Sequence, residues 1–478
     1  MVLTQGRVLQ DSRRRMFPRR HGRRPGAPDG AIVPACAAVV HPFSSGADAA
    51  GELRRLGCRV FAVVPAKPLA VHHFESFDSS RYDAVFTNHG DLAGLTRQLR
   101  RAGVTAVIPG CEDGVGLADH LSWLLGLAGN PRESTAARTS KQAQAAALAA
   151  AGVTHPRTLR ARTLPAAIAA VGELGGYPVV VKPDASAGND GVRIARGAGV
   201  LTEAWRVSAG KCNALGNYND GLLIQQHLAG VVFGEALPSW PGTPGTATWQ
   251  YTVNTVSAAP PGGPAVHYVT DAWLDRRREL DDGHSIYDLQ TLLDGADPVV
   301  GLISRHTAAV LDALHMRAGA AHVELMLVAA GDVSAGASRL TPVPIEAGAR
   351  LGGMISPPAM RAALGGSQVR VLAEALADPA RFGRRAARPY RRLAAAAQLD
   401  LIAPHDGVLD GVVLQEILSL PTVAAATPGL RPGARVSRTT DLFSSPGKLD
   451  LVGPAGQVAA DCAAVRAAER CLYRTPPA

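Results

Sequence analysis

Short apolar runs alternate with amphipathic stretches in the first quarter of the chain. Residues 35–40 are apolar, the following residues up to 56 have helical spacing, and residues 59–64 are apolar again. Another apolar run at residues 104–109 leads into an amphipathic stretch that ends near residue 127. Strands that alternate with helices favour an open parallel sheet, so we expect a small α/β domain over residues 32–133. No Gly-x-Gly-x-x-Gly follows the first strand, which argues against dinucleotide binding there.

Beyond residue 133 the pattern mixes helices with strands in a less regular order. We expect helices at residues 140–151, 368–376 and 382–387, and strands at residues 179–182, 222–226, 250–257, 267–271 and 321–328. Residues 231–249 are rich in Pro, Gly and Trp and follow neither period. They indicate an insertion, either a wall of a substrate pocket or a surface excursion. We expect a β-rich tail with turns at residues 404–407 and 444–447 to end the chain.

The composition is that of a globular protein. Its 478 residues are enough for about three domains, and 47% of them are hydrophobic and 19% charged. No apolar run reaches the roughly eighteen residues of a membrane span, and the six cysteines lack the spacing of a zinc site. We therefore expect a cytoplasmic protein with reduced, mostly buried thiols and no membrane partner.

The formal charge of +9 is concentrated at the start of the chain. Residues 1–31 contain eight arginines and two aspartates, a charge of +6, which leaves +3 for the remainder. We interpret residues 1–31 as a disordered basic tail and expect no nucleic-acid partner. Only five of the 49 lysine and arginine residues are lysines, at positions 67, 141, 182, 211 and 448. Positions that kept lysine are candidates for sites that need a compact ammonium group.

A glycine-rich hairpin follows one of these lysines, Lys182. Residues 183–190 are mostly small or turn-forming, and a second strand is expected to begin at Gly191. The backbone N–H groups of such a loop can close over phosphates, because no bulky side chain blocks the approach. A plain turn is the alternative reading of a Gly/Ser hairpin.

Two carboxylates stand among apolar neighbours in predicted strands. Glu324 and Glu346 are separated by a loop at residues 329–338, so their strands are expected to form a hairpin. An unpaired charge at such positions is unfavourable, whereas two facing carboxylates suit a hard divalent cation that also contacts phosphate oxygens. An ion pair between Glu346 and Arg350 is the alternative.

Five segments, in this order, resemble the ATP-grasp superfamily of carboxylate–amine ligases. They are residues 139–141, 177–192, 225–230, 322–324 and 346–353. The pattern Glu346-x-Gly348-x-Arg350-x-Gly-Gly, preceded by His322-x-Glu324, is most similar to the L-amino-acid ligases that make dipeptides, as are residues 42–46 and 441–447. The resemblance implies an α/β protein with an α+β ATP-grasp domain at residues 134–365. An open parallel-sheet domain would precede it, and an α+β subdomain at residues 366–478 would follow.

The resemblance also implies roles for individual residues. ATP and Mg²⁺, or Mn²⁺ in its place, are the implied cofactors. The implied nucleotide contacts are Lys141, Lys182, Ser186, Gly188, Gly191, Gln225, Gln226, His227, Leu228 and Arg277, and the implied metal ligands are Glu324 and Glu346. Within this set, residues 186–191 would form a mobile flap over the phosphates, and residues 225–228 a hinge whose backbone reads adenine. Lys141, Lys182 and Arg350 would be catalytic, with Arg350 stabilising charge on an acyl phosphate and a tetrahedral intermediate.

Four positions depart from the superfamily's usual pattern. Gln225 and Gln226 stand where relatives commonly have Glu, and Arg277 stands where a Lys is common. Gly348 stands where some relatives have an Asn that supplies a metal oxygen. The ribose-binding Glu of relatives has no clear counterpart, and either Glu235 or Gln250 could take its role.

The implied reaction activates a carboxylate as an acyl phosphate and couples it to an amine, giving a dipeptide or a similar amide. Glu112, at the end of a predicted strand, is a candidate base for the amine and is otherwise an acid at a helix start. Two alternatives stay open: a carboxylate ligase with a nucleophile that is not an amino acid, and a noncatalytic nucleotide-binding homologue. The expected partners are a small-molecule carboxylate and amine, and a homodimer is one of the oligomeric states that relatives adopt.

Overall fold

The structure is a computed structural model that describes residues 36–67, 77–232, 247–260, 262–329, 340–353, 355–427 and 429–475. The chain divides into two compact units, Met1–Ala31 and Ile32–Ala478, and every described residue belongs to the second. The expected basic tail therefore lies outside the described residues, as do Glu235 and most of the expected insertion. In these described ranges, no helix is long and apolar enough to cross a membrane.

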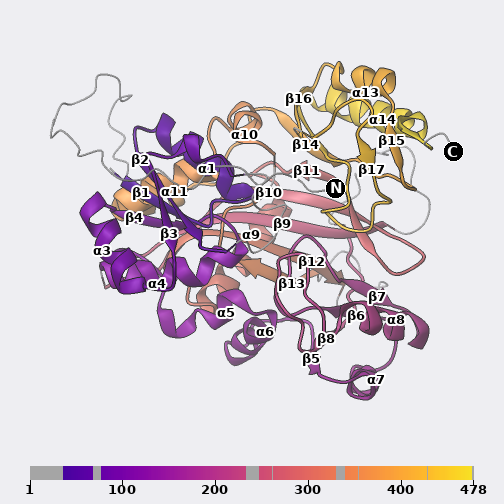
Figure 1. Cartoon of the computed structure of the whole chain (residues 1–478), viewed down its shortest axis with the longest axis horizontal. Helices are drawn as coiled ribbons and strands as arrows, with labels where there is room; N and C mark the ends of the chain where they lie inside the picture. Colours follow the sequence, from indigo (N-terminus) through magenta and orange to yellow (C-terminus); the bar gives the residue numbers. More distant parts are fainter. Residues whose placement is uncertain are drawn as a thin grey trace, which may run out of the picture. The chain divides into compact units, whose positions relative to one another are not determined.

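A four-stranded parallel sheet opens the described chain (Figure 1). Its order is β3-β2-β1-β4, with β1 at Cys36–Val40, β2 at Arg59–Pro65, β3 at Ala84–Asn88 and β4 at Ala106–Pro109. The accompanying helices are α1 at Ser45–Arg55, α3 at Leu92–Ala102 and α4 at Val115–Leu125. The expected βαβ unit and the strand near residue 104 are confirmed, whereas β3 and α3 were not predicted. β3 is a short edge strand that is only half buried, so its hydrophobic signal is weak.

The order of this sheet brings two loops together at its carboxyl edge. β1 lies between β2 and β4, so the chain leaves β1 and β4 at a topological switch point, where ligands commonly bind. A Cβ on Gly110 would lie 2.4 Å from the His41 carbonyl oxygen, and one on Gly46 would lie 2.4 Å from the Gly110 Cα. Glycine at both positions therefore permits the close packing of these two loops.

A second four-stranded sheet contains the glycine-rich hairpin. Its order is β5-β8-β6-β7, with β5 at Thr158–Ala161, β6 at Val179–Lys182, β7 at Arg193–Ala195 and β8 at Leu222–Gln226. Helices α5 at Ala136–Thr139, α6 at Lys141–Ala150, α7 at Leu164–Glu173 and α8 at Ala198–Ser208 accompany it. β7 begins two residues after Gly191, because Asn189 and Gly191 both take positive φ angles that belong to the turn.

The largest sheet has eight strands in the order β13-β12-β9-β10-β11-β14-β18-β16. The strands are β9 at Ala247–Ala258, β10 at Val266–Glu279, β11 at Ser285–Leu292, β12 at Ala318–Ala329, β13 at Leu340–Gly348, β14 at Ala395–Asp400, β16 at Val423–Ala426 and β18 at Lys448–Gly453. Helices α9 at Pro298–Ala313, α10 at Pro357–Leu364, α11 at Gln368–Ala377 and α12 at Pro379–Ala386 complete this part. Trp249 lies within β9, so the expected insertion ends earlier than residue 249.

The expectation of a β-rich tail is wrong in one respect, since two helices lie within it. Helix α13 spans Gly411–Leu418 and α14 spans Ala455–Leu472, beside a small sheet of β17 (Arg435–Val436), β15 (Gly407–Leu409) and β19 (Tyr473–Arg474). Asp410 caps α13 by accepting hydrogen bonds from the N–H groups of Val412 and Val413. The α+β subdomain implied at residues 366–478 has this mixed content, while the limits between domains stay predictions.

Candidate active site

One cavity of about 500 Å³ collects most of the residues singled out in the sequence. Those that line it are Lys141, Lys182, Ser186, Gly188, Gln225, Gln226, His227, Leu228, Glu324, Glu346 and Arg350. Gly191 and Arg277 do not line it. The switch-point loops contribute Ser44, Ser45, Cys111 and Glu112 to the same cavity. Three sheets that are distant along the sequence thus converge on one place.

The two expected metal carboxylates face each other across a strand pair. Glu324 on β12 is the direct partner of Glu346 on antiparallel β13, which confirms the expected hairpin. His322 Nε2 lies 3.5 Å from Glu324 Oε1, and its Nδ1 lies 2.8 Å from Asn254 Oδ1. Burial alone would raise the pKa of Glu324, but the contact with His322 and the charge of Arg277 lower it to about 2. Glu324 is therefore a carboxylate at neutral pH, as a metal ligand must be.

Nothing in the described ranges gathers three or more His, Cys, Asp and Glu side chains into a metal cluster. The donor set at this point is two carboxylates on neighbouring strands, beside lysines that can face phosphates. Mg²⁺ commonly binds one or two protein carboxylates and completes its octahedron with water and substrate phosphate oxygens. The residues present thus fit magnesium accompanied by a phosphorylated substrate.

Two of the five lysines stand at these carboxylates. Lys141 Nζ lies 3.1 Å from Glu346 Oε1 and donates a hydrogen bond of 2.8 Å to the Ser186 carbonyl oxygen. Ser140 caps helix α6 and donates to the Asp184 carboxylate, which fixes the start of the helix against the hairpin. Lys182 is 3% exposed, and burial lowers the pKa of its ammonium group to about 8 although the charge of Glu346 opposes this.

Arg277 lies behind Glu324 and does not reach the cavity wall. Its side chain is buried, with one guanidinium nitrogen 3.6 Å from Glu324 Oε2 and the guanidinium carbon 3.4 Å from the centre of the Tyr287 ring. Burial acts to lower the pKa of Arg277, but the charges of Tyr287, Glu324 and Asp275 raise it overall. In this position the arginine holds Glu324 in its ionised form, which differs from the phosphate contact expected from the sequence.

The expected hinge forms the end of β8 and the turn after it. Gln225 donates through Nε2 to Thr158 Oγ1 at 2.8 Å, and the Gln226 side chain accepts from the Arg157 N–H at 3.3 Å. Both glutamine side chains thus brace the start of β5, as does the Gln226 N–H, which donates to the Arg157 carbonyl oxygen at 2.8 Å. Gln250 lines the cavity, and its Oε1 atom is buried without a hydrogen-bond partner among the described residues. Such an orphan acceptor suits a hydroxyl-bearing ligand, so Gln250 is the ribose candidate that the described chain offers.

Glu112 and Arg350 form an ion pair over Gly348. Arg350 Nε lies 3.2 Å from Glu112 Oε2, and a Cβ added to Gly348 would lie 2.9 Å from that same oxygen. Burial raises the pKa of Glu112 although the charge of Arg350 lowers it. The alternative pairing of Glu346 with Arg350 is not present, because Glu346 contacts Lys141. Because position 348 has glycine where some relatives have Asn, there is room for the carboxylate of Glu112, which follows β4 of the first sheet.

The glycine-rich hairpin contacts the C-terminal part of the chain. The Leu442 N–H donates to the Gly188 carbonyl oxygen at 3.0 Å, and Asn189 Nδ2 donates to the Ser285 carbonyl oxygen at 2.8 Å. Leu442, Phe443 and residues 445–448 line the cavity. The loop at residues 441–447, which the sequence indicated through a predicted turn and through its resemblance, therefore closes the cavity against the hairpin.

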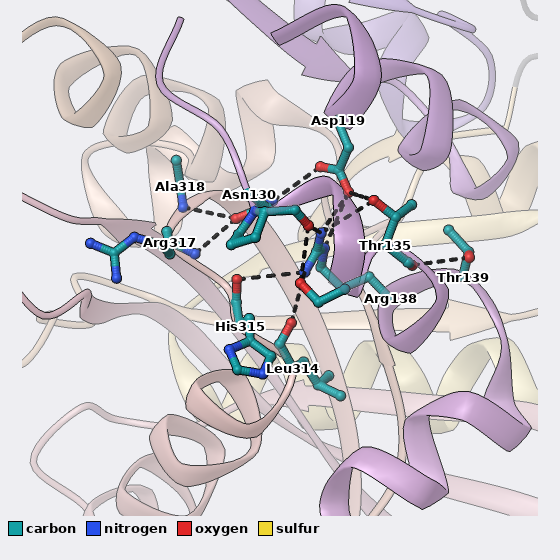
Figure 2. A network of polar contacts seen from close by, with 11 residues as sticks. Asp119, Asn130, Thr135, Arg138, Thr139, Leu314, His315, Arg317 and Ala318 are labelled. Atoms are coloured by element: carbon teal, nitrogen blue, oxygen red, sulfur yellow. Dashed lines mark hydrogen bonds and ion pairs between the residues drawn. The ribbon is translucent and has the colours of Figure 1, made fainter. Parts of the chain in front are cut away.

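A buried arginine anchors the segment before Lys141 (Figure 2). Arg138 donates to Asp119 Oδ2 at 2.8 Å, to the Leu314 carbonyl oxygen at 2.8 Å and to the Pro131 carbonyl oxygen at 2.7 Å. It also lines a second cavity of about 280 Å³ that shares Lys141 and Glu346 with the first. Sequence analysis missed Arg138, and forty-four arginines offer no signal to pick it out.

Comparisons with known proteins find relatives in sequence and in fold. No family model matches the chain. The curated dapdiamide A synthase of Enterobacter agglomerans is 28% identical over 374 residues, which cover 77% of this chain and 80% of that protein. The solved L-amino acid ligase from Bacillus licheniformis has a TM-score of 0.64 at 16% identity, covering 93% of this chain and all of that one. The carboxyaminoimidazole ribonucleotide synthase from Aspergillus clavatus complexed with ATP has a TM-score of 0.60 at 14% identity, over 92% and 99%. These structural likenesses show a shared fold.

Proposed function

We propose that this chain, an ATP-grasp carboxylate–amine ligase, activates the carboxylate of an amino acid with ATP and couples it to an amine, forming a dipeptide or a similar amide. The observation that carries the proposal is the pairing of Glu324 with Glu346 in register, with Lys141, Lys182 and Arg350 around the same cavity. The names of the dapdiamide synthase and of the L-amino acid ligase support an amide-forming reaction of this class.

The chain's own residues account for the charge that this reaction must overcome. A carboxylate and a phosphoryl group repel each other, so cations must hold them together. Lys141 and Lys182 are proposed to bind the phosphates, and Arg350 to bind the developing charge on the acyl group. Glu324 and Glu346 are the residues that would hold magnesium, whose charge neutralises phosphate oxygens when it is bound.

The amine must lose a proton before or while it attacks the acyl carbon. Glu112 is the proposed acceptor, because it is a carboxylate at the cavity wall whose pKa is raised by burial. Its contact with Arg350 keeps it beside the residue that is proposed to face the acyl group. Gln225, Gln226, His227 and Leu228 are proposed to receive adenine through their backbone, and Gln250 to receive the ribose.

The direct test is release of ADP and phosphate from magnesium ATP with pooled amino acids, followed by mass spectrometry of the product. A product whose mass equals two components minus water is expected. Lys182→Ala and Glu324→Ala should abolish ADP release, while Lys211→Ala, which changes an exposed lysine outside the cavity, should not. Full turnover by either of the first two variants would overturn the site assignment.

The same assay separates the two alternatives. ADP release with an amine that is not an amino acid would identify a carboxylate ligase with a different nucleophile. ATP binding without ADP formation, across a broad panel of acids and amines, would identify a noncatalytic homologue. Circular dichroism and thermal unfolding of each variant show that a loss of activity is not a loss of fold.

A further inference from the structure

Polar side chains from several strands of the eight-stranded sheet line the cavity. Successive residues of a strand point to opposite faces, so residues paired in register share a face. Glu346 and Glu324 stand on β13 and β12, at one edge of the sheet. Gln290 on β11 pairs with Gln398 on β14, and Asp400 on β14 pairs with Lys448 on β18, toward the other side. All six residues line the cavity.

The part of the cavity lined by β14 contains two buried polar atoms without hydrogen-bond partners among the described residues. They are Gln398 Nε2 and Asp400 Oδ2, and the two residues are 4% and 2% exposed. The alternate residues Ala397 and Leu399 pack into the C-terminal hydrophobic core, so the strand fixes which side chains face the cavity. A buried donor and a buried acceptor without partners are unfavourable, and such groups commonly mark a binding site.

The sequence provides an independent observation at the same place. Lys448 is one of the five lysines, and it stands directly opposite Asp400. Its Nζ atom donates a hydrogen bond of 2.9 Å to the Gly353 carbonyl oxygen. Gly353 lies three residues after Arg350, so Lys448 joins this end of the cavity to the segment proposed to bind the acyl group.

We propose that Gln398, Asp400 and Lys448 form a subsite for the side chain of the acid substrate, and that this side chain ends in a neutral group with one hydrogen-bond donor and one acceptor, such as a carboxamide. This inference rests on the proposed function and adds a substrate class to it. The carboxamide oxygen accepts from Gln398, and its NH₂ group donates to Asp400. Lys448 positions Asp400 and the Gly353 segment around the side chain.

The charges and distances of the subsite favour a neutral group over a charged one. A substrate carboxylate would be repelled by Asp400, and a substrate ammonium group would be repelled by Lys448 and would leave the Gln398 donor without a partner. Residues two apart on a strand are separated by roughly 7 Å. A carboxamide with a hydrogen bond of about 2.9 Å at each end spans that separation. Burial raises the pKa of Asp400 to about 6, so the side chain is ionised and able to accept at pH 7 and above.

The test compares acids of equal size that differ at the end of the side chain. Asparagine, aspartate and leucine form one set, and glutamine, glutamate and methionine form another. ADP release by the full chain with magnesium ATP and pooled amines is expected to show kcat/KM at least tenfold higher for the carboxamide of each set. In Gln398→Met and Asp400→Leu this preference should fall below threefold, while the KM for ATP stays unchanged.

Gln415→Met is the matched control, because it makes the same substitution at an exposed glutamine outside the cavity. It should keep the full preference. Turnover that favours the apolar or the acidic member of both sets would overturn the subsite and leave the proposed function intact. If Gln398→Met and Asp400→Leu kept the preference for the carboxamide, the subsite would also be overturned and the proposed function would stay intact.

Absence of ADP release with all six acids would instead contradict the proposed amino-acid ligase, and binding then decides the subsite. Thermal unfolding of the wild-type chain is measured with each acid in the presence of magnesium ADP. A rise in Tm with asparagine or glutamine that exceeds the rise with the other acids, and that is lost in Gln398→Met, supports the subsite. Equal shifts for all members, or no shift, overturn it.

Discussion

The Glu112 carboxylate occupies the space next to Gly348. A side chain at position 348 would displace this carboxylate. In Gly348→Ala the new Cβ would lie 2.9 Å from Glu112 Oε2 and 3.4 Å from Arg350 Nε. The ion pair must move, and a displacement of about 1 Å at reacting groups lowers rates by about a hundredfold. We expect kcat/KM for the acid to fall by about tenfold to a hundredfold, with Tm nearly unchanged. Gly172→Ala is the control, since Gly172 is exposed on helix α7 outside the cavity and its Cβ would contact nothing within 4 Å; equal losses in both would contradict the argument.

The burial of Asp400 leads us to expect that the difference in stability between the wild type and Asp400→Asn depends on pH. Burial raises its pKa from 3.8 to about 6, with the charge of Lys448 opposing the rise. Well below pH 3.8 the side chain is protonated in the folded and the unfolded chain, so its charge has no effect on stability. Between pH 4 and 6 ionisation favours the unfolded chain, and above pH 6 the penalty is constant at about 3 kcal/mol or less. Asp400→Asn should therefore unfold at a higher urea concentration than wild type at pH 7, with the difference much smaller near pH 4. A difference that is the same at both pH values would rule out this cause.

The sequence predicts the role of some residues better than that of others. Glu324, Glu346 and the retained lysines stand out because a charge among apolar strand residues, or a lysine in an arginine-rich chain, requires a reason. The position of Arg277 does not follow from sequence, because the register of β10 with β11 shifts between Arg276 and Arg277. That bulge decides which arginine points toward Glu324. Gln398 and Asp400 come from a strand paired far along the chain, so no local pattern links them to the site.

At the scale of elements, Arg138 connects three segments around the start of helix α6. It donates to Asp119 on α4, to the Pro131 carbonyl oxygen and to the Leu314 carbonyl oxygen that follows α9 (Figure 2). Removing one partner of a buried ion pair leaves an uncompensated charge, which costs about 3–5 kcal/mol. Arg138→Met should lower the free energy of unfolding in urea by about that amount. Arg132→Met, at an exposed arginine six residues earlier, should lower it by less than about 1 kcal/mol.

A double variant separates the ion pair from the other hydrogen bonds of Arg138. With Asp119→Asn added, the loss should be smaller than the sum of the two single losses, because the uncompensated charge is removed. Additive losses would mean that Arg138 acts through the carbonyl oxygens alone.

Elements with a strong period were predictable, and those whose burial comes from distant contacts were not. The expected strands at residues 35–40, 179–182 and 222–226 are confirmed because their apolar runs are buried in the sheets. Helix α14 was missed although Val458, Cys462 and Val465 face the core at spacings of four and three residues. Four of the five positions between them are alanines, and alanine is compatible with either face of a helix, so the apolar stripe is hidden.

At the scale of the whole molecule, the cavity depends on contacts between segments that are 95 to 306 residues apart. Ser45 Oγ donates to the Leu351 carbonyl oxygen, Lys448 Nζ to the Gly353 carbonyl oxygen, and the Leu442 N–H to the Gly188 carbonyl oxygen. The sequence motifs indicated which chemistry such loops could perform. Their meeting point follows from sheet order and register, which local periodicity does not determine.

The distribution of charge over the whole chain leads to a last prediction. Residues 1–31 carry +6 of the formal charge of +9, and every residue that lines the described cavity belongs to Ile32–Ala478. Deleting residues 1–31 should therefore leave kcat and the KM for ATP within about twofold of the full chain. Binding to duplex DNA, measured across a range of salt concentrations, should become weaker and less dependent on salt, because fewer counterions are released. Salt-dependent DNA binding that persists unchanged after the deletion would place a nucleic-acid surface on the folded part of the chain, where a charge of +3 gives no reason to expect one.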